Sequence, residues 1–214
     1  MAISIDDIKK LRAMTGAGLA DVKKALTEAE GDFDKAKELL RERGLAIAAK
    51  RSDRETSNGC VLVKAADGFA AMIALKCETD FVANGADFIA LTQIILDAAI
   101  ANKCKDIEAV KALTINGQTA QEAVTQRSGI TGEKMELDGY LTLEGDNIEV
   151  YNHMGKNTLC TMVQLNKNAA EIGHKLAMQV AAMKPVALDA QSVDLKILDE
   201  EYIAGQGIGA RIRF

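Results

Sequence analysis

The residues of this 214-residue chain that could act on a substrate or hold a metal are few and scattered. Its four cysteines form no Cys-x-x-Cys pair: Cys60, Cys77, Cys104 and Cys160. Only His153 and His174 could join them as ligands, and neither has a serine or cysteine neighbour at triad spacing. Structural zinc sites and nucleophile–base pairs depend on such spacing. The sequence therefore predicts no catalytic site, no metal site and no cofactor.

Two glycine-containing runs have the composition of nucleotide-binding loops without their context. No strand pattern precedes Thr15–Gly18 and no Gly-Lys-Ser/Thr follows it, so the phosphate-binding signature is absent. The run 205–209 is followed by only five residues, which is too few for the helix of a dinucleotide-binding motif. Neither run is expected to bind phosphate.

A large apolar ring beside a carboxylate marks the polar connection 78–87. Aromatic residues make up only 4% of the chain, yet Phe81 follows Asp80 there. In one interpretation Thr79 or Asp80 caps the next helix, while Phe81 and Val82 staple that helix to a sheet. In the other, Phe81 enters a pocket of a partner protein and Asp80 competes for a partner's cation. Local features leave both interpretations open.

Residues 1–44 are predicted to form three short helices, because apolar side chains recur in them at helical spacing. Ser4 is a suitable N-cap for the first helix and Asp32 for the third. Gly31 is expected to end the second helix in a left-handed conformation, and Gly44 is expected to end the third. The polar stretch 45–58 is then predicted to be a linker with a basic centre.

Two β-hairpins, each followed by a helix, are predicted beyond the linker. Cys60–Lys64 and Phe69–Cys77 are β-rich and are separated by an Asp-Gly turn signal. The same order returns with Ile148–Asn152, Leu159–Leu165 and a helix from about Ala169, which suggests an internal duplication. Only three residues separate strand from helix in the second half. The connection around Phe81 is thus longer than this fold requires.

Composition favours a folded chain and argues against nucleic acid and a membrane as partners. Hydrophobic residues make up 48% of the chain and charged residues 27%, as in globular proteins. A net charge of −5 without a long Lys/Arg run argues against direct binding to nucleic acid. No apolar run is long enough for a membrane span, and no leader is evident. A cytoplasmic location is expected, and dimerisation is left open.

Two segments together resemble the elongation factor Ts family. The first is Leu11–Gly18 with the following 21–26, and the second is Cys77–Ala83. A third segment, 174–185, resembles the helix of that family's second core half. The order and spacing of the three segments make the resemblance specific over about residues 3–200. It implies an α+β fold, with an N-terminal three-helix ubiquitin-associated-like domain followed by a core of two related β-hairpin/helix subdomains.

The resemblance also implies a function without catalysis. The chain is expected to be a guanine-nucleotide exchange factor that binds elongation factor Tu in its GDP form. Asp80 and Phe81 would enter the partner's GTPase domain and disturb its magnesium and phosphate site, which loosens GDP. The implied nucleotide-release loop consists of Thr79, Asp80, Phe81, Val82 and Ala83.

Further partner contacts follow from the same resemblance. Arg12 and Leu19 would touch a helix of the partner's GTPase domain. Ala20 stands where family members often have Met, which would weaken that contact. His153 matches a family histidine that lies near the inserted Phe81 and supports it.

The division of the chain follows from these expectations. The predicted parts are a three-helix domain 1–44, a linker 45–58, core subdomain one 59–135, core subdomain two 136–204 and an atypical C-terminal tail 205–214. Most family members continue past the equivalent of Tyr202 into a helical hairpin that the tail does not match. The tail is either that of a shortened natural variant or that of a truncated or altered product, and the sequence leaves both interpretations open. A competing function is an adaptor whose three-helix module binds a ubiquitin-like or nascent-chain partner.

Overall fold

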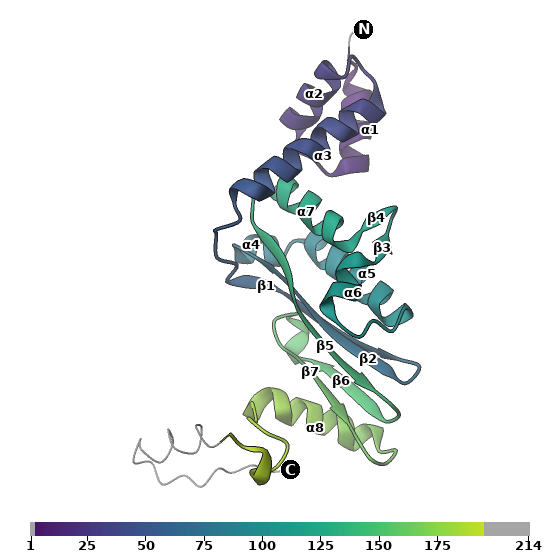
Figure 1. The fold of residues 1–214 in the computed structure, drawn as a ribbon, viewed down its shortest axis with the longest axis vertical. Helices are drawn as coiled ribbons and strands as arrows, with labels where there is room; N and C mark the ends of the chain where they lie inside the picture. The colour runs from purple at the N-terminus through teal and green to yellow at the C-terminus, as the bar shows by residue number, and fades with distance from the viewer. Residues whose placement is uncertain (1–2, 195–214) are drawn as a thin grey trace, which may run out of the picture.

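The computed structural model describes residues 3–194, and the predicted tail 205–214 lies outside the described residues. Figure 1 shows three layers along the longest axis of the molecule. A three-helix module occupies one end, a three-stranded sheet with its helices the middle, and a β-hairpin with one helix the other end. The mixture of helix and strand confirms the predicted α+β class.

The N-terminal module consists of the three predicted helices: α1 (Ile5–Thr15), α2 (Leu19–Glu28) and α3 (Phe33–Lys50). Ser4 and Asp7 form a reciprocal capping box at α1, and Asp32 caps α3 as predicted. Gly31 has φ +89° and donates its N–H to Leu26 O, which satisfies a carbonyl at the end of α2. The likeness of this module to a ubiquitin-associated domain stays a prediction.

The prediction that the third helix ends at Gly44 is wrong, because α3 continues to Lys50. Gly44 is buried where α3 crosses α7 (Ala120–Thr131) at Gly129. A Cβ atom on Gly129 would lie 2.1 Å from the Gly44 Cα. The glycine thus permits close contact of two helix backbones instead of ending a helix. Part of the predicted linker 45–58 is consequently helical.

The central sheet is antiparallel, in the order β1-β2-β5. Its strands are β1 (Asn58–Ala66), β2 (Phe69–Cys77) and β5 (Met135–Glu144). Asp67 and Gly68 have φ of +49° and +71°, so the predicted hairpin turn is confirmed with the two left-handed residues that a tight hairpin prefers. Strand β5 crosses the predicted subdomain boundary at residue 135 and pairs along β2. Strand pairing therefore does not follow that boundary, and the division into domains stays a prediction.

Helices cover the sheet and complete the main core. Helix α5 (Ala86–Ala101) packs on β1 and β2, and α7 packs on β5. Phe88, Ile95 and Phe69 are almost fully buried between these layers. Sequence reasoning assigned no elements to residues 102–134, where the structure has α6 (Ile107–Ala112), β3 (Thr114–Ile115), β4 (Gln118–Thr119) and α7.

The second predicted hairpin and its helix are confirmed. They comprise β6 (Ile148–Asn152), the 3₁₀ turn η1 (His153–Gly155), β7 (Cys160–Gln164) and α8 (Ala170–Met183). A further 3₁₀ turn, η2, spans Ala190–Ser192. The Val61 N–H donates to Asn157 O, so the hairpin is joined to the edge of β1. Helix α8 covers the hairpin.

All four cysteines are buried and reduced. Burial raises the pKa of Cys60 to about 11 and that of Cys160 to about 12, because desolvation disfavours the thiolate. Protonated interior thiols are poor nucleophiles and poor metal ligands. Within residues 3–194 no group of three or more His, Cys, Asp or Glu side chains could hold a metal ion. The helices of the same part of the chain are too short or too polar to span a bilayer.

Candidate functional site

The connection between β2 and α5 contains a one-turn helix, α4 (Asp80–Ala83), instead of an irregular loop. Thr79 is its N-cap, and the Thr79 Oγ accepts a hydrogen bond of 3.3 Å from the Val82 N–H. At the other end Asn84 donates its backbone N–H and its side-chain amide to Asp80 O. The capping interpretation is confirmed for Thr79, and the helix that it caps is α4.

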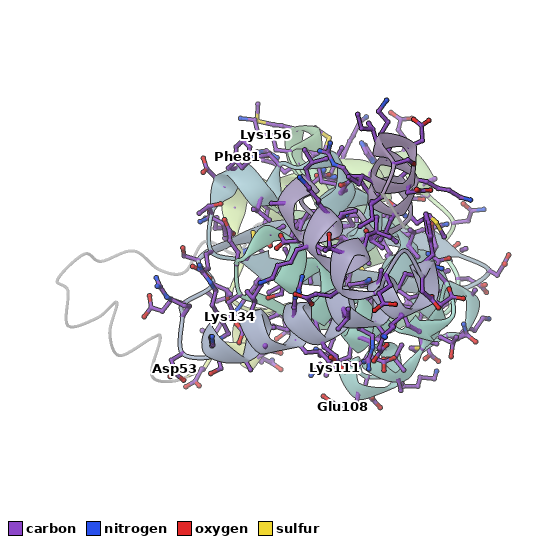
Figure 2. All side chains as sticks on the ribbon, turned by 90° about the horizontal axis from the view of Figure 1, so that it is seen from above. Asp53, Phe81, Glu108, Lys111, Lys134 and Lys156 are labelled. Carbon is purple, nitrogen blue, oxygen red and sulfur yellow. The ribbon has the colours of Figure 1, made fainter. Side chains whose placement is uncertain are left out.

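The two faces of α4 have opposite environments. Ala83 is buried and Val82 packs against the main core, which fixes one face to the protein. Phe81 has 86% of its surface exposed, and Asp80 is exposed beside it. Figure 2 shows Phe81 at the periphery of the molecule, on the same side as Lys156. The stapling interpretation therefore holds for Val82 but is wrong for Phe81, whose ring is free to contact a partner.

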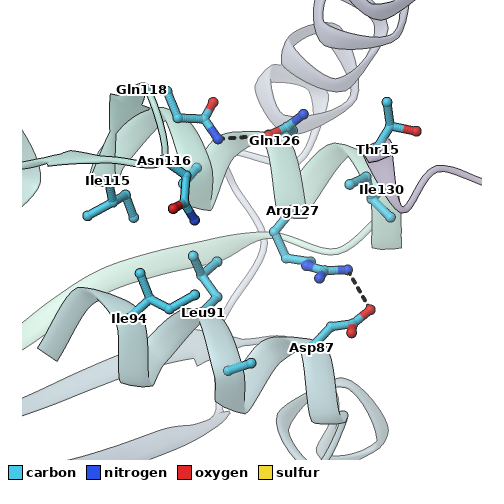
Figure 3. A pocket seen from close by; sticks show the side chains of 12 residues that line it. Thr15, Asp87, Leu91, Ile94, Ile115, Asn116, Gln118, Gln126, Arg127 and Ile130 are labelled. Atoms are coloured by element: carbon cyan, nitrogen blue, oxygen red, sulfur yellow. Dashed lines mark hydrogen bonds and ion pairs between the residues drawn. The ribbon is translucent and has the colours of Figure 1, made fainter. Parts of the chain in front are cut away.

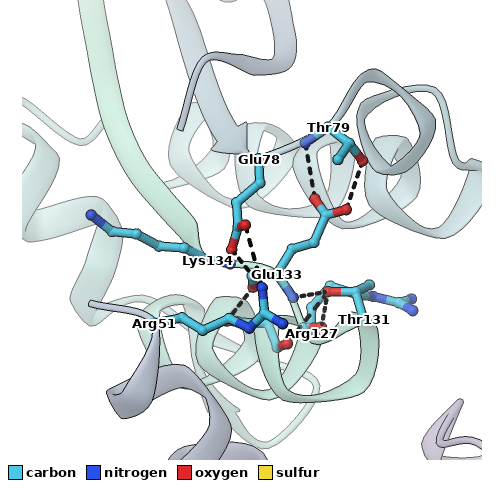
Figure 4. A network of polar contacts seen from close by, with 8 residues as sticks. Arg51, Glu78, Thr79, Arg127, Thr131, Glu133 and Lys134 are labelled. Atoms are coloured by element: carbon cyan, nitrogen blue, oxygen red, sulfur yellow. Dashed lines mark hydrogen bonds and ion pairs between the residues drawn. The ribbon is translucent and has the colours of Figure 1, made fainter. Parts of the chain in front are cut away.

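Glu133 holds the base of α4. Its Oε2 accepts the Thr79 backbone N–H at 3.0 Å, and its Oε1 accepts the Thr79 hydroxyl at 2.6 Å (Figure 4). Glu133 lies in the turn between α7 and β5, directly after the left-handed C-cap Gly132. One carboxylate thus joins two segments that lie 54 residues apart in the sequence.

Glu78 makes a second attachment next to the first. Its carboxylate accepts the Lys134 backbone N–H at 2.6 Å and pairs with the Arg51 guanidinium at 3.2 Å (Figure 4). Arg51 is the C-cap of α3, so the attachment reaches the N-terminal module. The Lys134 N–H, and then Arg51, hold the pKa of Glu78 below its ordinary value of 4.5.

Acidification is expected to weaken this attachment. Because the folded-state pKa of Glu78 is lowered, its contribution to stability is present above the unfolded value and is lost as pH falls through the folded value. We expect wild type to resist urea better than Glu78→Gln at pH 7, and the difference to shrink at pH 3. The measurement is the urea midpoint of both proteins at the two pH values. A difference that is equal at both values would contradict the assignment.

The other predicted partner residues lie on separate elements. Arg12 is exposed in the last turn of α1, and Leu19, 58% exposed, begins α2. The α3–α7 crossing joins their module to the core that carries α4. His153 lies in η1, where its Nδ1 is 3.3 Å from the Tyr151 hydroxyl. The predicted support of Phe81 by His153 stays a prediction.

Comparison with known proteins shows the family of this chain. The family model described as Elongation factor TS matches residues 78–208, a range that begins at Glu78 and includes α4. The chain belongs to the elongation factor Ts family. The resemblance that the sequence motifs indicated is thereby confirmed, and the comparisons lend no support to the adaptor alternative.

The curated relatives are close in sequence. The chain is 61% identical over 202 residues to elongation factor Ts of Bacteroides fragilis, covering 94% of this chain and 61% of that protein. It is 60% identical to elongation factor Ts of Parabacteroides distasonis, again covering 94% and 61%. For that of Porphyromonas gingivalis the identity is 49% over 203 residues, covering 94% and 74%. The chain thus spans about three fifths of the length of the first two relatives.

A cavity of about 230 Å³ lies between α5, α7 and the β3–β4 hairpin (Figure 3). Apolar side chains such as Leu91 and Ile130 line it. Four of its polar side chains pair across the wall: Arg127 with Asp87 at 3.2 Å, and Gln118 with Gln126 at 3.0 Å. Because these groups already bind one another, α4 is the stronger candidate for the functional site.

Sequence reasoning missed the residues that hold α4. Arg51 lay in the predicted linker, and Glu78 was only the first residue of a long connection. Glu133 belongs to no motif, and its partner Thr79 is distant in sequence. A single sequence carries no signal for such a pair, because hydrogen bonds between distant segments depend on tertiary contact.

Proposed function

We propose that this chain is a guanine-nucleotide exchange factor for elongation factor Tu. It binds the GDP form, inserts Asp80 and Phe81 beside the magnesium and phosphate site, and so promotes release of GDP during translation elongation. The observation that carries the proposal is the exposed Phe81 on an anchored one-turn helix, in a chain of this family. In this function the protein has no catalytic site of its own and works in the cytoplasm.

The environment of Phe81 supports the proposal physically. An aromatic side chain that remains in water gains its burial energy only when a partner covers it, and buried aromatic anchors dominate many interfaces. The backbone beneath Phe81 is held from both ends of α4. A held backbone loses less conformational entropy on binding, so more of the burial energy remains for displacing groups of the partner.

Exchange then follows from linkage. Magnesium bridges phosphate oxygens and protein ligands in GTPases, so displacing its surroundings weakens GDP binding. If the factor lowers the affinity for GDP by some ratio, GDP lowers the affinity for the factor by the same ratio.

Arg12 and Leu19 would provide a second, persistent contact from the N-terminal module. Ala20 makes that contact smaller than a methionine would.

The test is the release of fluorescently labelled GDP from elongation factor Tu, chased with excess unlabelled GDP. We expect the release rate to rise with the concentration of this chain and to reach a plateau. A chase without the factor, with and without EDTA, gives the intrinsic rate and the rate after removal of magnesium. A release rate that stays at the intrinsic value at every concentration of the chain would overturn the proposal.

A further inference from the structure

We propose that Glu133 is a positioning residue for the Phe81 helix, and that its carboxylate sets the orientation in which α4 presents the ring. The inference deepens the proposed function and rests on it for its consequence in nucleotide exchange. The role of Glu133 in orienting α4 concerns this chain alone and does not depend on the partner. Glu133 lies outside α4, in the turn between α7 and β5.

Both carboxylate oxygens of Glu133 accept hydrogen bonds from one residue, Thr79. Oε2 takes the Thr79 N–H and Oε1 takes the Thr79 hydroxyl, at 3.0 Å and 2.6 Å. Hydrogen bonds to an ionised carboxylate are shorter and stronger than neutral ones. Two bonds to one residue also restrict rotation of its backbone and side chain together. Thr79 is thereby fixed at the point where the chain leaves β2 and enters α4.

The hydroxyl of Thr79 has only one hydrogen, which makes the carboxylate part of the cap. That hydrogen is donated to Glu133, so the Oγ lone pairs remain available for the Val82 N–H. Without the carboxylate the hydroxyl hydrogen is no longer held in one direction, so a lone pair of the Oγ is no longer kept facing the Val82 N–H. Glu133 therefore acts on α4 through Thr79.

Glu133 is itself held at both sides of its backbone. The hydroxyl of Ser128, a residue only 2% exposed, donates to Glu133 O at 2.5 Å. The Glu133 N–H donates to Thr131 Oγ at 3.3 Å. Gly132 has φ +72°, a left-handed conformation that turns the chain at the end of α7 and directs it toward Thr79. The carboxylate is thus presented from the rigid end of a 12-residue helix.

Phe81 needs this support because its own packing is slight. With 86% of its surface exposed, the ring cannot hold α4 in place. A helix of four residues is also too short to be stable by its own hydrogen bonds. The side chains of Val82 and Ala83 and the Thr79 cap connect α4 to the core. Loss of the Glu133 bonds is therefore expected to loosen the position of Phe81 without opening the core.

The first experiment measures the position of the loop directly and needs no partner. The chain contains no tryptophan, so Phe81→Trp introduces a single tryptophan at the tip of α4, which can be excited apart from the three tyrosines. We compare its fluorescence anisotropy in the Phe81→Trp background with and without Glu133→Gln. Glu108→Gln serves as the matched control, since Glu108 is an exposed carboxylate paired with Lys111 on α6. We expect Glu133→Gln to lower the anisotropy and Glu108→Gln to leave it unchanged.

The second experiment measures exchange with Phe81 intact. We expect Glu133→Gln to lower factor-stimulated GDP release about fivefold at unchanged melting temperature, because a hydrogen bond to a charged group is replaced by a weaker one. Thr79→Ser keeps the hydroxyl and should retain most of the rate, whereas Thr79→Val should lose it. In the double variant Thr79→Val with Glu133→Gln the two losses of rate should combine to less than the product of the single effects, because both changes act on the hydroxyl bond, whereas only Glu133→Gln also weakens the bond to the Thr79 backbone N–H.

The two experiments separate the inference from the proposed function. Lower anisotropy in Glu133→Gln, with a wild-type chain that never accelerates GDP release, would support the positioning role and overturn the function. Unchanged anisotropy at unchanged melting temperature would overturn the positioning role whatever the exchange rates are. A fall in melting temperature with unchanged anisotropy would show a general structural role instead, and would overturn the inference as well.

Discussion

Replacing Phe81 with alanine is expected to lower factor-stimulated GDP release about thirtyfold, since an aromatic anchor at an interface contributes about 2 kcal/mol and each 1.4 kcal/mol is a factor of ten. The ring has 86% of its surface in water in the free protein, so burial against the partner is gained only in the complex. The measurement is the rate of labelled GDP release from elongation factor Tu at a subsaturating concentration of the factor.

The fold of the Phe81→Ala variant should be unaffected. Substitutions of exposed side chains change the free energy of unfolding by about 0.5 kcal/mol or less. Leu141→Ala is the matched control, because Leu141 is also a large apolar side chain, 63% exposed, but lies on strand β5. Equal exchange rates for Phe81→Ala and Leu141→Ala would show that Phe81 has no special part in release.

Replacing Gly129 with alanine is expected to destabilise the protein by about 1–3 kcal/mol, as overpacking of a close contact does. The added Cβ would lie 2.1 Å from Gly44 Cα and 2.8 Å from Gly44 C and O. These are backbone atoms of α3, so no side-chain rotation can relieve the clash. Helix α3 must move away from α7, and the N-terminal module moves with it. The decrease in the free energy of unfolding is measured by urea denaturation.

Gly44→Ala is the matched control at the same crossing. There the nearest atoms to an added Cβ are Gly129 Cα at 3.6 Å and Gln126 O at 3.9 Å, which are ordinary contacts. Because alanine favours a helix over glycine by up to about 1 kcal/mol, Gly44→Ala should be neutral or stabilising. By helix preference alone Gly129→Ala would stabilise too. If Gly129→Ala and Gly44→Ala had the same free energy of unfolding in urea, the close crossing of α3 and α7 would be disproved.

Local signals predicted much of the fold. The N-cap residues Ser4 and Asp32, the left-handed Gly31 and the Asp67–Gly68 turn act over a few residues, and all four are confirmed in the structure. Gly44 shows where this reasoning failed. Glycine often ends a helix, but it also permits close helix contact, and only the position of Gly129 distinguishes the two uses.

The segment around Asp80 and Phe81 shows both what can be predicted from sequence and what depends on the folded structure. Its residues alone show that an aromatic ring and a carboxylate stand together in a connection longer than the fold requires, and its motifs indicate the family that the comparisons confirm. The folded structure was needed to show that Thr79 caps a one-turn helix, that Phe81 is exposed, and that Glu133 and Glu78 anchor the base of that helix. The physical reason is distance along the chain. Composition and periodicity report on neighbours, whereas exposure and anchoring depend on segments that meet only when the chain folds.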